Sequence, residues 1–458
     1  MIRTRIILYA FIIFILSVEL IACGVDDGMD RNTIAIESEQ IEDDILDSEE
    51  QSSIDKNIKE ESEETFPNVK FVKCETMEGT AAAITEDGKL YMWGRNSGKI
   101  DETKLLHYSY QEPKLVMEHV ADIKIGGFTV AAITEDGELY IWGMEFSLAS
   151  DAKDGTAGSS CIKVMDNVKQ IDICSGETIA AVTKNGELYV WGYGINGITG
   201  NRDAQKEYEP KYIMDNVDKI QINNIGTIGV LTFDNQLYVW GDNHNKQVGV
   251  MSEANQFWEP QLIMENVKQY KIGAAVSVAV TENNELYIWG KGLAAHVESQ
   301  DDIESIIYEP EKIMEHVKMA DANSGTAMAV TTDGKLYTWG QKGLNGREED
   351  NIEPMVLLEN IYIACFDKNA VCYAISNKGE LFTWGRGDEY QLGNGRKDEF
   401  CKPSQIFSDA KYVSCGDFYS IMIDNQGKLY HWGTIWNDKN RYWDEMPNSV
   451  CLSEYYTE

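Results

Sequence analysis

The chain has 458 residues, with 40 lysines and arginines against 76 aspartates and glutamates, a formal net charge of -36 and 43% hydrophobic residues. This apolar content can build a core, which excludes a wholly disordered chain. A chain with this much negative charge repels nucleic-acid phosphates and anionic membrane surfaces. The composition therefore argues against nucleic-acid binding. Nine cysteines without any CxxC pair favour neither a disulfide framework nor structural zinc.

The first 23 residues have the layout of a secretory signal. Two arginines precede an apolar run over residues 6–18, which is too short to span a bilayer. Leu20-Ile21-Ala22-Cys23 follows at once and resembles the bacterial lipobox, in which a small residue precedes a cysteine that is cleaved and diacylated. The resemblance implies a signal peptide over 1–23, a lipid on Cys23 and an extracytoplasmic, membrane-anchored lipoprotein of a bacterium. A signal with an incidental cysteine is the alternative.

Residues 24–66 form an acidic segment. It holds 16 acidic and 3 basic residues, a net charge of -13, and its few isoleucines keep no helical period. Such a segment cannot bury enough apolar surface to offset the entropy of ordering, so we predict an acidic disordered linker. Loose calcium binding by the acid runs is the alternative.

One unit recurs through the rest of the chain, residues 67–458. The pentapeptide Leu-Tyr-x-Trp-Gly, or a near variant, occurs eight times, and its tryptophans lie 45 to 50 residues apart. A fixed period of this length indicates a repeat architecture. The eight tryptophans, which we interpret as structural core residues, are Trp93, Trp142, Trp191, Trp240, Trp289, Trp339, Trp384 and Trp432.

A tight hairpin precedes each pentapeptide. Residues 131–134 and 139–143, for example, are apolar strands joined by the turn 135–138. Such turns require positive φ, which Gly, Asn and Asp tolerate. Four units carry Asp-Gly or Asn-Gly in the turn, and two carry Asp234-Asn235 and Asn283-Asn284. The repeat is therefore an antiparallel β unit.

The fold class that these units predict is all-β, a single β-propeller. Both faces of the Leu-Tyr-x-Trp strand are apolar, so each sheet needs a neighbour on both sides, and radial repetition supplies them. An open β-solenoid is the alternative. A Glu-Pro-led segment recurs at Pro113, Pro210, Pro260, Pro310 and Pro354, and residues 446–452 look like the Pro-led strand that the first unit lacks, so we expect the C-terminal strand to close the ring.

The string Thr-x-Asp-Gly-x-Leu-Tyr-x-Trp-Gly resembles the repeat of the regulator of chromosome condensation family. That family continues with Asn-x-x-Gly-Gln-Leu-Gly, and residues 246–249 and 390–393 come close to it. The family's His before the inner strand is absent here, where residues 126–129 and 175–178 stand in its place. Family propellers usually have seven blades. The spacing favours eight, and seven blades remain the alternative.

The resemblance also suggests what the chain does. Eukaryotic members of the family are guanine-nucleotide exchange factors on chromatin. An exported, acidic chain meets neither chromatin nor a cytoplasmic GTPase, so we do not expect this activity here. Related secreted bacterial propellers bind proteins. We therefore expect a protein- or glycan-recognition module, a monomer with an envelope or extracellular partner, attached to the membrane through Cys23 and independent of nucleic acid.

The sequence contains no recognisable catalytic or metal site. No HExxH, Gly-x-Ser-x-Gly or EF-hand spacing occurs, and the GxGxxG string at 192–197 opens no predicted helix. His119 and His316 share one repeat position, which favours a structural role. Buried free thiols are expected for most cysteines, with a Cys365–Cys372 disulfide as an alternative. We predict no cofactor, no metal and no catalytic residue.

The aromatics outside the pentapeptide supply the candidate binding residues. Aromatic side chains on one rim of a rigid ring are typical anchors for a partner. The candidates are Trp436, Trp443, Trp258, Tyr108 and Phe146, although Trp258, like Tyr208 and Tyr308, precedes a Glu-Pro and can equally serve packing. The alternatives are an architectural spacer of the envelope, or a polysaccharide-acting enzyme using loop carboxylates such as Glu145, Asp151 and Asp154.

Overall fold

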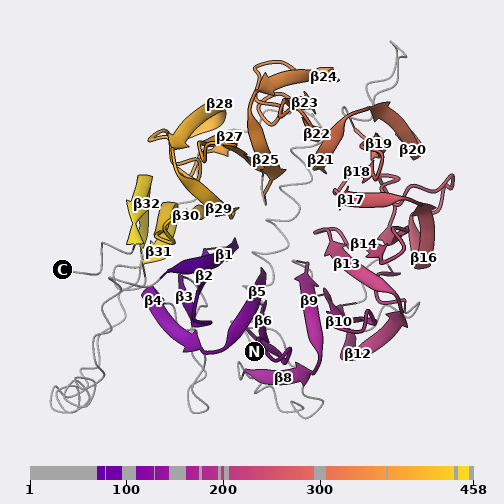
Figure 1. Ribbon diagram of the computed structural model, residues 1–458, viewed down its shortest axis with the longest axis horizontal. Coiled ribbons are helices and arrows are strands. Elements are labelled where there is room, and N and C mark those ends of the chain that lie inside the picture. Colours follow the sequence, from indigo (N-terminus) through magenta and orange to yellow (C-terminus); the bar gives the residue numbers. More distant parts are fainter. Residues whose placement is uncertain are drawn as a thin grey trace, which may run out of the picture. The chain divides into compact units, whose positions relative to one another are not determined.

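Eight four-stranded antiparallel sheets follow one another along the chain, and each is a meander in chain order. The computed structural model describes residues 70–77, 79–94, 110–127, 129–143, 161–174, 178–193, 197–200, 206–292, 306–367, 370–437 and 442–452. All of them belong to one unit, Thr65–Glu458. Figure 1 shows the sheets as blades around a common centre, numbered here 1 to 8 along the chain. The predicted all-β propeller is confirmed, with eight blades.

Each blade runs from an inner to an outer strand. The inner strands are β1 (Phe71–Met77), β5 (Val120–Gly126), β9 (Val168–Ile173), β13 (Val217–Ile222), β17 (Val267–Ile272), β21 (Val317–Ala322), β25 (Ile361–Phe366) and β29 (Ala410–Cys415). The second strands are β2 (Thr80–Thr85), β6 (Thr129–Thr134), β10 (Thr178–Thr183), β14 (Thr227–Thr232), β18 (Val276–Thr281), β22 (Thr326–Thr331), β26 (Val371–Ser376) and β30 (Tyr419–Asp424).

The third strands carry the pentapeptide. They are β3 (Leu90–Gly94), β7 (Leu139–Gly143), β11 (Leu188–Tyr193), β15 (Leu237–Asp242), β19 (Leu286–Lys291), β23 (Leu336–Gly340), β27 (Leu381–Gly387) and β31 (Leu429–Asn437). The outer strands are β4 (Tyr110–Met117), β8 (Ile162–Met165), β12 (Lys206–Met214), β16 (Gln256–Met264), β20 (Ile306–Met314), β24 (Asn351–Leu358), β28 (Asp398–Phe407) and β32 (Tyr442–Cys451). Seven outer strands contain a proline, whose missing N–H costs nothing at a free sheet edge.

The two faces of each third strand pack against different blades. Leu139 and Ile141 lie in one cluster with Ile171 and Trp191 of blade 3, whereas Trp142 lies in another with Leu90 of blade 1. The leucine and the variable residue therefore face the following blade, and the tryptophan faces the preceding one. Because every sheet is apolar on both faces, the ring is stable only when each blade has two neighbours.

One backbone hydrogen bond recurs at all eight junctions between blades. The N–H at the start of an inner strand donates to a carbonyl in the hairpin turn of the preceding blade, as Val120 does to Gly88 at 2.8 Å and Val267 to Asn235 at 2.9 Å. Asn235 takes φ 62°, so Asn replaces Gly in the turn as predicted. The last bond of the series runs from Phe71 to Gly427 at 2.9 Å and joins blade 8 to blade 1.

The C-terminal strand closes the ring in a different way from the one we expected. β32 pairs with β31 and completes blade 8, while the first blade has its own Pro-led strand, β4. The repeat therefore begins one strand later than the sequence pattern suggested, at the inner strand. Closure comes from packing, since Leu452 directly after β32 lies in one cluster with Phe71 and Trp93.

Candidate functional site

The inner strands expose one edge to the centre of the ring, and glutamines of the neighbouring blade cover it. Gln170 of β9 donates through Nε2 to the Ile220 carbonyl at 3.1 Å and accepts from the Ile220 N–H at 3.3 Å. Gln221 makes the same pair of bonds with Ile272, and Gln269 with Ala320. Side chains thus replace the missing partner strand, because unpaired backbone groups are costly.

Charged residues lie beside the inner strands as well. We call these residues and the three glutamines together the inner girdle. Lys73 pairs with Asp122, Lys124 lies 3.7 Å from Glu75, and Lys271 lies 3.6 Å from Asp321. The facing carboxylates raise the pKa values of Lys124 and Lys271 above their usual range, whereas burial raises the pKa of Asp321.

The same protection continues toward the closing blades. Asp321 accepts from the Phe366 N–H at 3.2 Å, and Asp367 accepts from the Cys415 N–H at 2.5 Å. The Ser414 hydroxyl accepts from the Thr76 N–H at 3.2 Å, between blades 8 and 1. The girdle therefore runs across the point where the ring closes.

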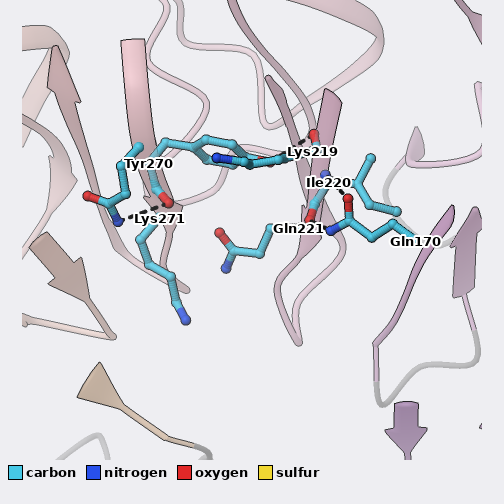
Figure 2. A pocket seen from close by; sticks show the side chains of 7 residues that line it. Gln170, Lys219, Ile220, Gln221, Tyr270 and Lys271 are labelled. Carbon is cyan, nitrogen blue, oxygen red and sulfur yellow. Dashed lines mark hydrogen bonds between the residues drawn. The ribbon is translucent and has the colours of Figure 1, made fainter. Parts of the chain in front are cut away.

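A cavity of about 240 Å³ opens on the girdle at blades 3 to 5 (Figure 2). Its lining is Gln170, Lys219, Ile220, Gln221, Gln269, Tyr270 and Lys271. The three glutamines are held by backbone groups, the Tyr270 hydroxyl donates to the Gly229 carbonyl at 2.7 Å, and Lys271 faces Asp321. The lining groups are therefore mostly committed to sealing strand edges, and we assign the cavity to the girdle.

Each third strand begins at the hairpin turn and ends at the connection to the outer strand. We call the face of the ring that carries these connections the loop face. In blade 4 the carbonyl of Gln247 accepts from Trp289 Nε1 at 2.8 Å and from Ser277 Oγ at 3.0 Å, both of blade 5. In blade 7 the carbonyl of Gln391 accepts from Trp432 Nε1 and Ser420 Oγ, each at 2.8 Å. The backbone of the Gln-Leu-Gly-like motif therefore accepts hydrogen bonds from buried side chains of the next blade. We call a loop segment that does this a plug.

An acid–base pair fixes each plug glutamine. Gln247 Nε2 donates to Asp242 at 2.7 Å, and the same carboxylate lies 2.6 Å from His244 Nδ1. In blade 7 Gln391 Nε2 donates to Asp388 at 3.1 Å, and Arg386 completes the pair. The His244–Asp242 contact, which looks like half of a catalytic triad, therefore serves to position a loop.

Two further junctions use the same arrangement with other residues. Trp240 Nε1 donates to the Ile198 carbonyl and Trp384 Nε1 to the Leu344 carbonyl, each at 2.9 Å. Trp142 and Trp191 have no acceptor for Nε1 among the described residues, and the loops that precede their blades, 95–109 and 144–160, lie outside them.

At the junction between blades 8 and 1, which we call the closing seam, no loop carbonyl of the described residues accepts from the motif tryptophan. Trp93 Nε1 donates instead to the hydroxyl of Tyr419 at 3.0 Å, and this hydroxyl is hydrogen-bonded to His431 Nδ1. Trp93 and Tyr419 are 0% exposed and His431 is 8% exposed. The Tyr419 side chain, from β30, takes the place that a loop occupies elsewhere.

In blade 8 the third and outer strands continue as a longer hairpin instead. β31 and β32 continue for four residue pairs beyond Gly433↔Met446, through Trp436↔Trp443 to Asn437↔Tyr442. The other third strands end at most two residues after the motif glycine. We call residues 434–437 and 442–445 the arm.

Blade 7 supports the base of the arm. Thr434 Oγ1 donates to the Glu389 carbonyl at 2.8 Å, and Lys397 lies 3.1 Å from Glu445. Asn394 forms an isolated β-bridge with Asn448, just below the arm. The arm therefore begins from a fixed position on the loop face.

The sequence-predicted binding residues fall into three groups. Trp436 and Trp443 are register partners on the arm. Trp258 is half-buried against Gly197, whose added Cβ would lie 3.1 Å from the indole, so the structure favours packing at this position. Cys23, Tyr108, Phe146, Glu145, Asp151 and Asp154 lie outside the described residues. The structure does not bring these five binding candidates together in one described cluster.

The other candidate residues lie where they serve the fold. The side chains of the eight motif tryptophans are 0 to 2% exposed. His119 and His316 have φ 58° and 61° in the turns between outer and inner strands, where most blades carry Asn. Cys365 and Cys372 are free thiols, so the alternative of a disulfide is wrong, and burial raises the pKa of Cys365 to about 12. Among the described residues no group of side chains could hold a metal, and no helix could cross a membrane.

Sequence reasoning missed the closing seam. His431 stands at a variable position of the pentapeptide, and Tyr419 lies twelve residues before it with no motif of its own. The available signal was the histidine itself, because the seven equivalent residues are aliphatic, Met or Thr.

The fold and its junctions define an eight-bladed propeller built from one repeated β unit. The model of the regulator of chromosome condensation (RCC1) repeat matches residues 234–280 and 378–423. These two stretches of the chain are RCC1-type repeats. Propellers of this type are in general interaction or exchange-factor modules rather than catalysts.

Solved structures share this fold. Prp20p from Saccharomyces cerevisiae is 18% identical with a TM-score of 0.56, over 78% of this chain and 94% of that one. Human WBSCR16 is 19% identical with a TM-score of 0.50, over 65% and 84% of the two chains. At these identities the likeness concerns the fold alone.

Similar proteins of known sequence match over short stretches. The human E3 ubiquitin-protein ligase HERC2 is 32% identical over 99 residues, which are 19% of this chain and 2% of that protein. The X-linked retinitis pigmentosa GTPase regulator homolog of Caenorhabditis elegans is 41% identical over 63 residues, 13% of this chain and 4% of that protein. The chain thus spans only a small part of these relatives.

Proposed function

We propose that this protein is a protein-recognition module that binds its partner with the arm and the neighbouring loop face. One observation carries the proposal. At four junctions the connection between third and outer strands is needed to plug the next blade, whereas Tyr419 closes the seam after blade 8. The connection of blade 8 is built instead as a continuation of the β31–β32 hairpin, the arm.

The composition of the arm fits this role. It carries Trp436, Tyr442 and Trp443, and Trp and Tyr are enriched among the residues that dominate binding energy at protein interfaces. Its base is fixed by blade 7, so little flexibility is lost on binding. A rigid scaffold that presents a variable connection is the usual arrangement of a recognition site.

We expect the variant Trp436→Ala/Trp443→Ala to lose at least ten-fold in affinity for the partner while its unfolding midpoint stays within about 2 °C of wild type. The measurement is capture of envelope proteins and glycans by the purified full-length protein, followed by titration of whatever is retained. Phe233→Ala is the matched control, because Phe233 is 53% exposed and lies in a hairpin turn at the end of blade 4 opposite the loop face.

Each other result has a definite meaning. A partner lost with Phe233→Ala and kept by the arm variant would place recognition on the opposite face. A retained glycan would replace the protein partner by a saccharide. Failure to retain anything would favour the architectural spacer.

We further propose that the propeller is displayed outside a bacterial cell by a lipid on Cys23. The support is the run 20–23 behind a short apolar segment, and the acidic residues 24–66 would separate the ring from the membrane. We expect Cys23→Ser to abolish incorporation of radiolabelled palmitate and to move the protein out of the membrane fraction. Ser38→Cys is the control, and labelling that persists in Cys23→Ser would contradict the anchor.

A further inference from the structure

The sealing of strand edges changes at the junction between blades 4 and 5. In blades 3 and 5 the third residue of the inner strand is a glutamine that seals the fourth residue of the next blade, as Gln170 accepts from the Ile220 N–H and donates to its carbonyl. Tyr270 is the fourth residue of β17, but the sealing position before it holds Lys219. The Tyr270 carbonyl accepts from Gln269 Nε2 at 3.4 Å. Its N–H has no acceptor among the described residues, because an ammonium group only donates.

The ammonium group of Lys219 has no partner in the part of the chain that the structure describes. The other lysine in this position of the repeat, Lys73, is paired with Asp122. The carboxylates on the inner strands beside the cavity already have partners. These contacts are Asp218 to Lys169 at 3.3 Å, Asp321 to Lys271 at 3.6 Å and Asp172 to the Ile222 N–H at 2.7 Å. Lys219 therefore brings an uncompensated positive charge to the cavity, in a chain with nearly twice as many acidic as basic residues.

Two more residues of this junction depart from the repeat together. Tyr270 stands where the other seven inner strands carry Cys, Ile, Ala or Val, and Gly229 stands where no other blade has glycine. A Cβ added to Gly229 would lie 2.6 Å from Cε2 of Tyr270, so the glycine makes room for the ring. The Tyr270 hydroxyl donates to the Gly229 carbonyl at 2.7 Å. The ring is therefore held as a fixed wall of the cavity.

We propose that the cavity at blades 3 to 5 binds a small oxyanion, a carboxylate or a phosphate, between Lys219 and the Tyr270 N–H (Figure 2). Such a group neutralises the lysine and accepts hydrogen bonds from both donors. Gln170 and Gln221 each use one amide hydrogen on a strand edge, which leaves each a second hydrogen. The inference lies beyond recognition by the arm and does not depend on it.

The size and charge of the cavity limit the ligand. Its volume of about 240 Å³ is that of about eight water molecules, which suits a molecule of the size of phosphate or succinate. Lys219 is exposed, so water screens its charge and the attraction is modest. We therefore expect a dissociation constant of about 1 mM at low ionic strength, which weakens as salt is added.

Amine footprinting of the unmodified full-length protein tests the site directly. Acetylation by an N-hydroxysuccinimide ester, followed by peptide-level mass spectrometry, gives a rate for each lysine. We expect 20 mM phosphate or succinate to slow the modification of Lys219 by about 20-fold, as a dissociation constant of about 1 mM requires. Sodium chloride of equal ionic strength should slow it by less than about two-fold. Lys411, which is exposed on β29 of blade 8, is the internal control and should not respond to either oxyanion.

Two matched variants separate this site from general charge. Lys219→Gln places the sealing residue of blades 3 and 5 in blade 4, so it should abolish binding measured by titration calorimetry and leave the unfolding midpoint unchanged or raised. Lys73→Gln removes the paired lysine of the same repeat position and should keep the affinity of the wild type. Stronger protection by phosphate or by succinate would identify the type of oxyanion.

Four results would overturn the site. They are protection of Lys219 by neither oxyanion, protection no greater than with chloride, binding that survives in Lys219→Gln, and an equal loss of binding in Lys73→Gln. If Lys219→Gln does not fold, the footprint of the wild-type protein still decides, because it compares Lys219 with Lys411 in one sample.

Discussion

Gly290→Ala should destabilise the ring by about 3 kcal/mol or more, because the substitution combines backbone strain with a clash. Gly290 has φ +110°, and an added Cβ would lie 2.1 Å from the carbonyl oxygen of Ala275. Ala275 directly precedes β18, and its carbonyl accepts from the Lys291 N–H at 2.9 Å, so it cannot move aside without breaking this bond to β19. Guanidinium unfolding followed by circular dichroism measures the loss.

Gly334→Ala separates the two contributions. Gly334 also has positive φ, +85°, but the nearest atoms to an added Cβ lie 3.6 Å away, so only strain of about 1 kcal/mol is expected. Equal losses in the two variants would show that the close approach contributes nothing. The same approach recurs at the motif glycines of other blades, namely Gly94, Gly241, Gly340, Gly385 and Gly433. This contact explains why Gly follows Trp in the repeated pentapeptide.

The fold could be predicted because each repeat expresses the same local physics eight times. Positive φ in the hairpin turn, an apolar strand on both faces and proline on the free edge are all properties of residues close in sequence, and each was correctly derived. The start of the blade was not, because the choice of first strand depends on which strands pair across the ring. β32 pairs with β31 and therefore belongs to blade 8, but no local sequence pattern distinguishes β32 from a strand that would complete blade 1.

The functional parts of the ring were less accessible to sequence reasoning for the same reason. The closing seam joins Trp93 to Tyr419 across 326 residues, and neither residue differs in type from its surroundings in a way that reveals the contact. The glutamines of the girdle look like ordinary polar residues of an exposed strand until the neighbouring edge is placed beside them. Trp436 and Trp443 were recognised as unusual, and the strand register alone placed them opposite each other on one hairpin.

The junctions also determine how the ring can be divided. Four junctions are closed by a backbone carbonyl of a loop and the closing seam by the Tyr419 side chain, while a recurring turn-to-strand hydrogen bond holds all eight. A partner that grips the arm would therefore act on blade 8 alone, at the position where the ring is closed by side chains. Recognition and ring closure share one blade, although they use different residues of it.

Trp289→Ala should cost about 3–5 kcal/mol of the free energy of unfolding, as removal of a large buried aromatic does. Trp289 is 0% exposed, and its Nε1 donates to the Gln247 carbonyl at 2.8 Å. Trp289→Phe keeps most of the packing and should cost about 1–2 kcal/mol, because Ser277 Oγ still donates to the same carbonyl at 3.0 Å. Denaturant unfolding measures both losses.

The double variant Ser277→Ala/Trp289→Phe tests the reason for this difference. It removes both side-chain donors from the buried Gln247 carbonyl, and an unsatisfied buried acceptor costs about 1–3 kcal/mol beyond the loss of a single bond. We therefore expect the double variant to lose more stability than the sum of the two single variants. Strict additivity would mean that the carbonyl finds another donor, and the plug would then act between blades 4 and 5 through packing alone.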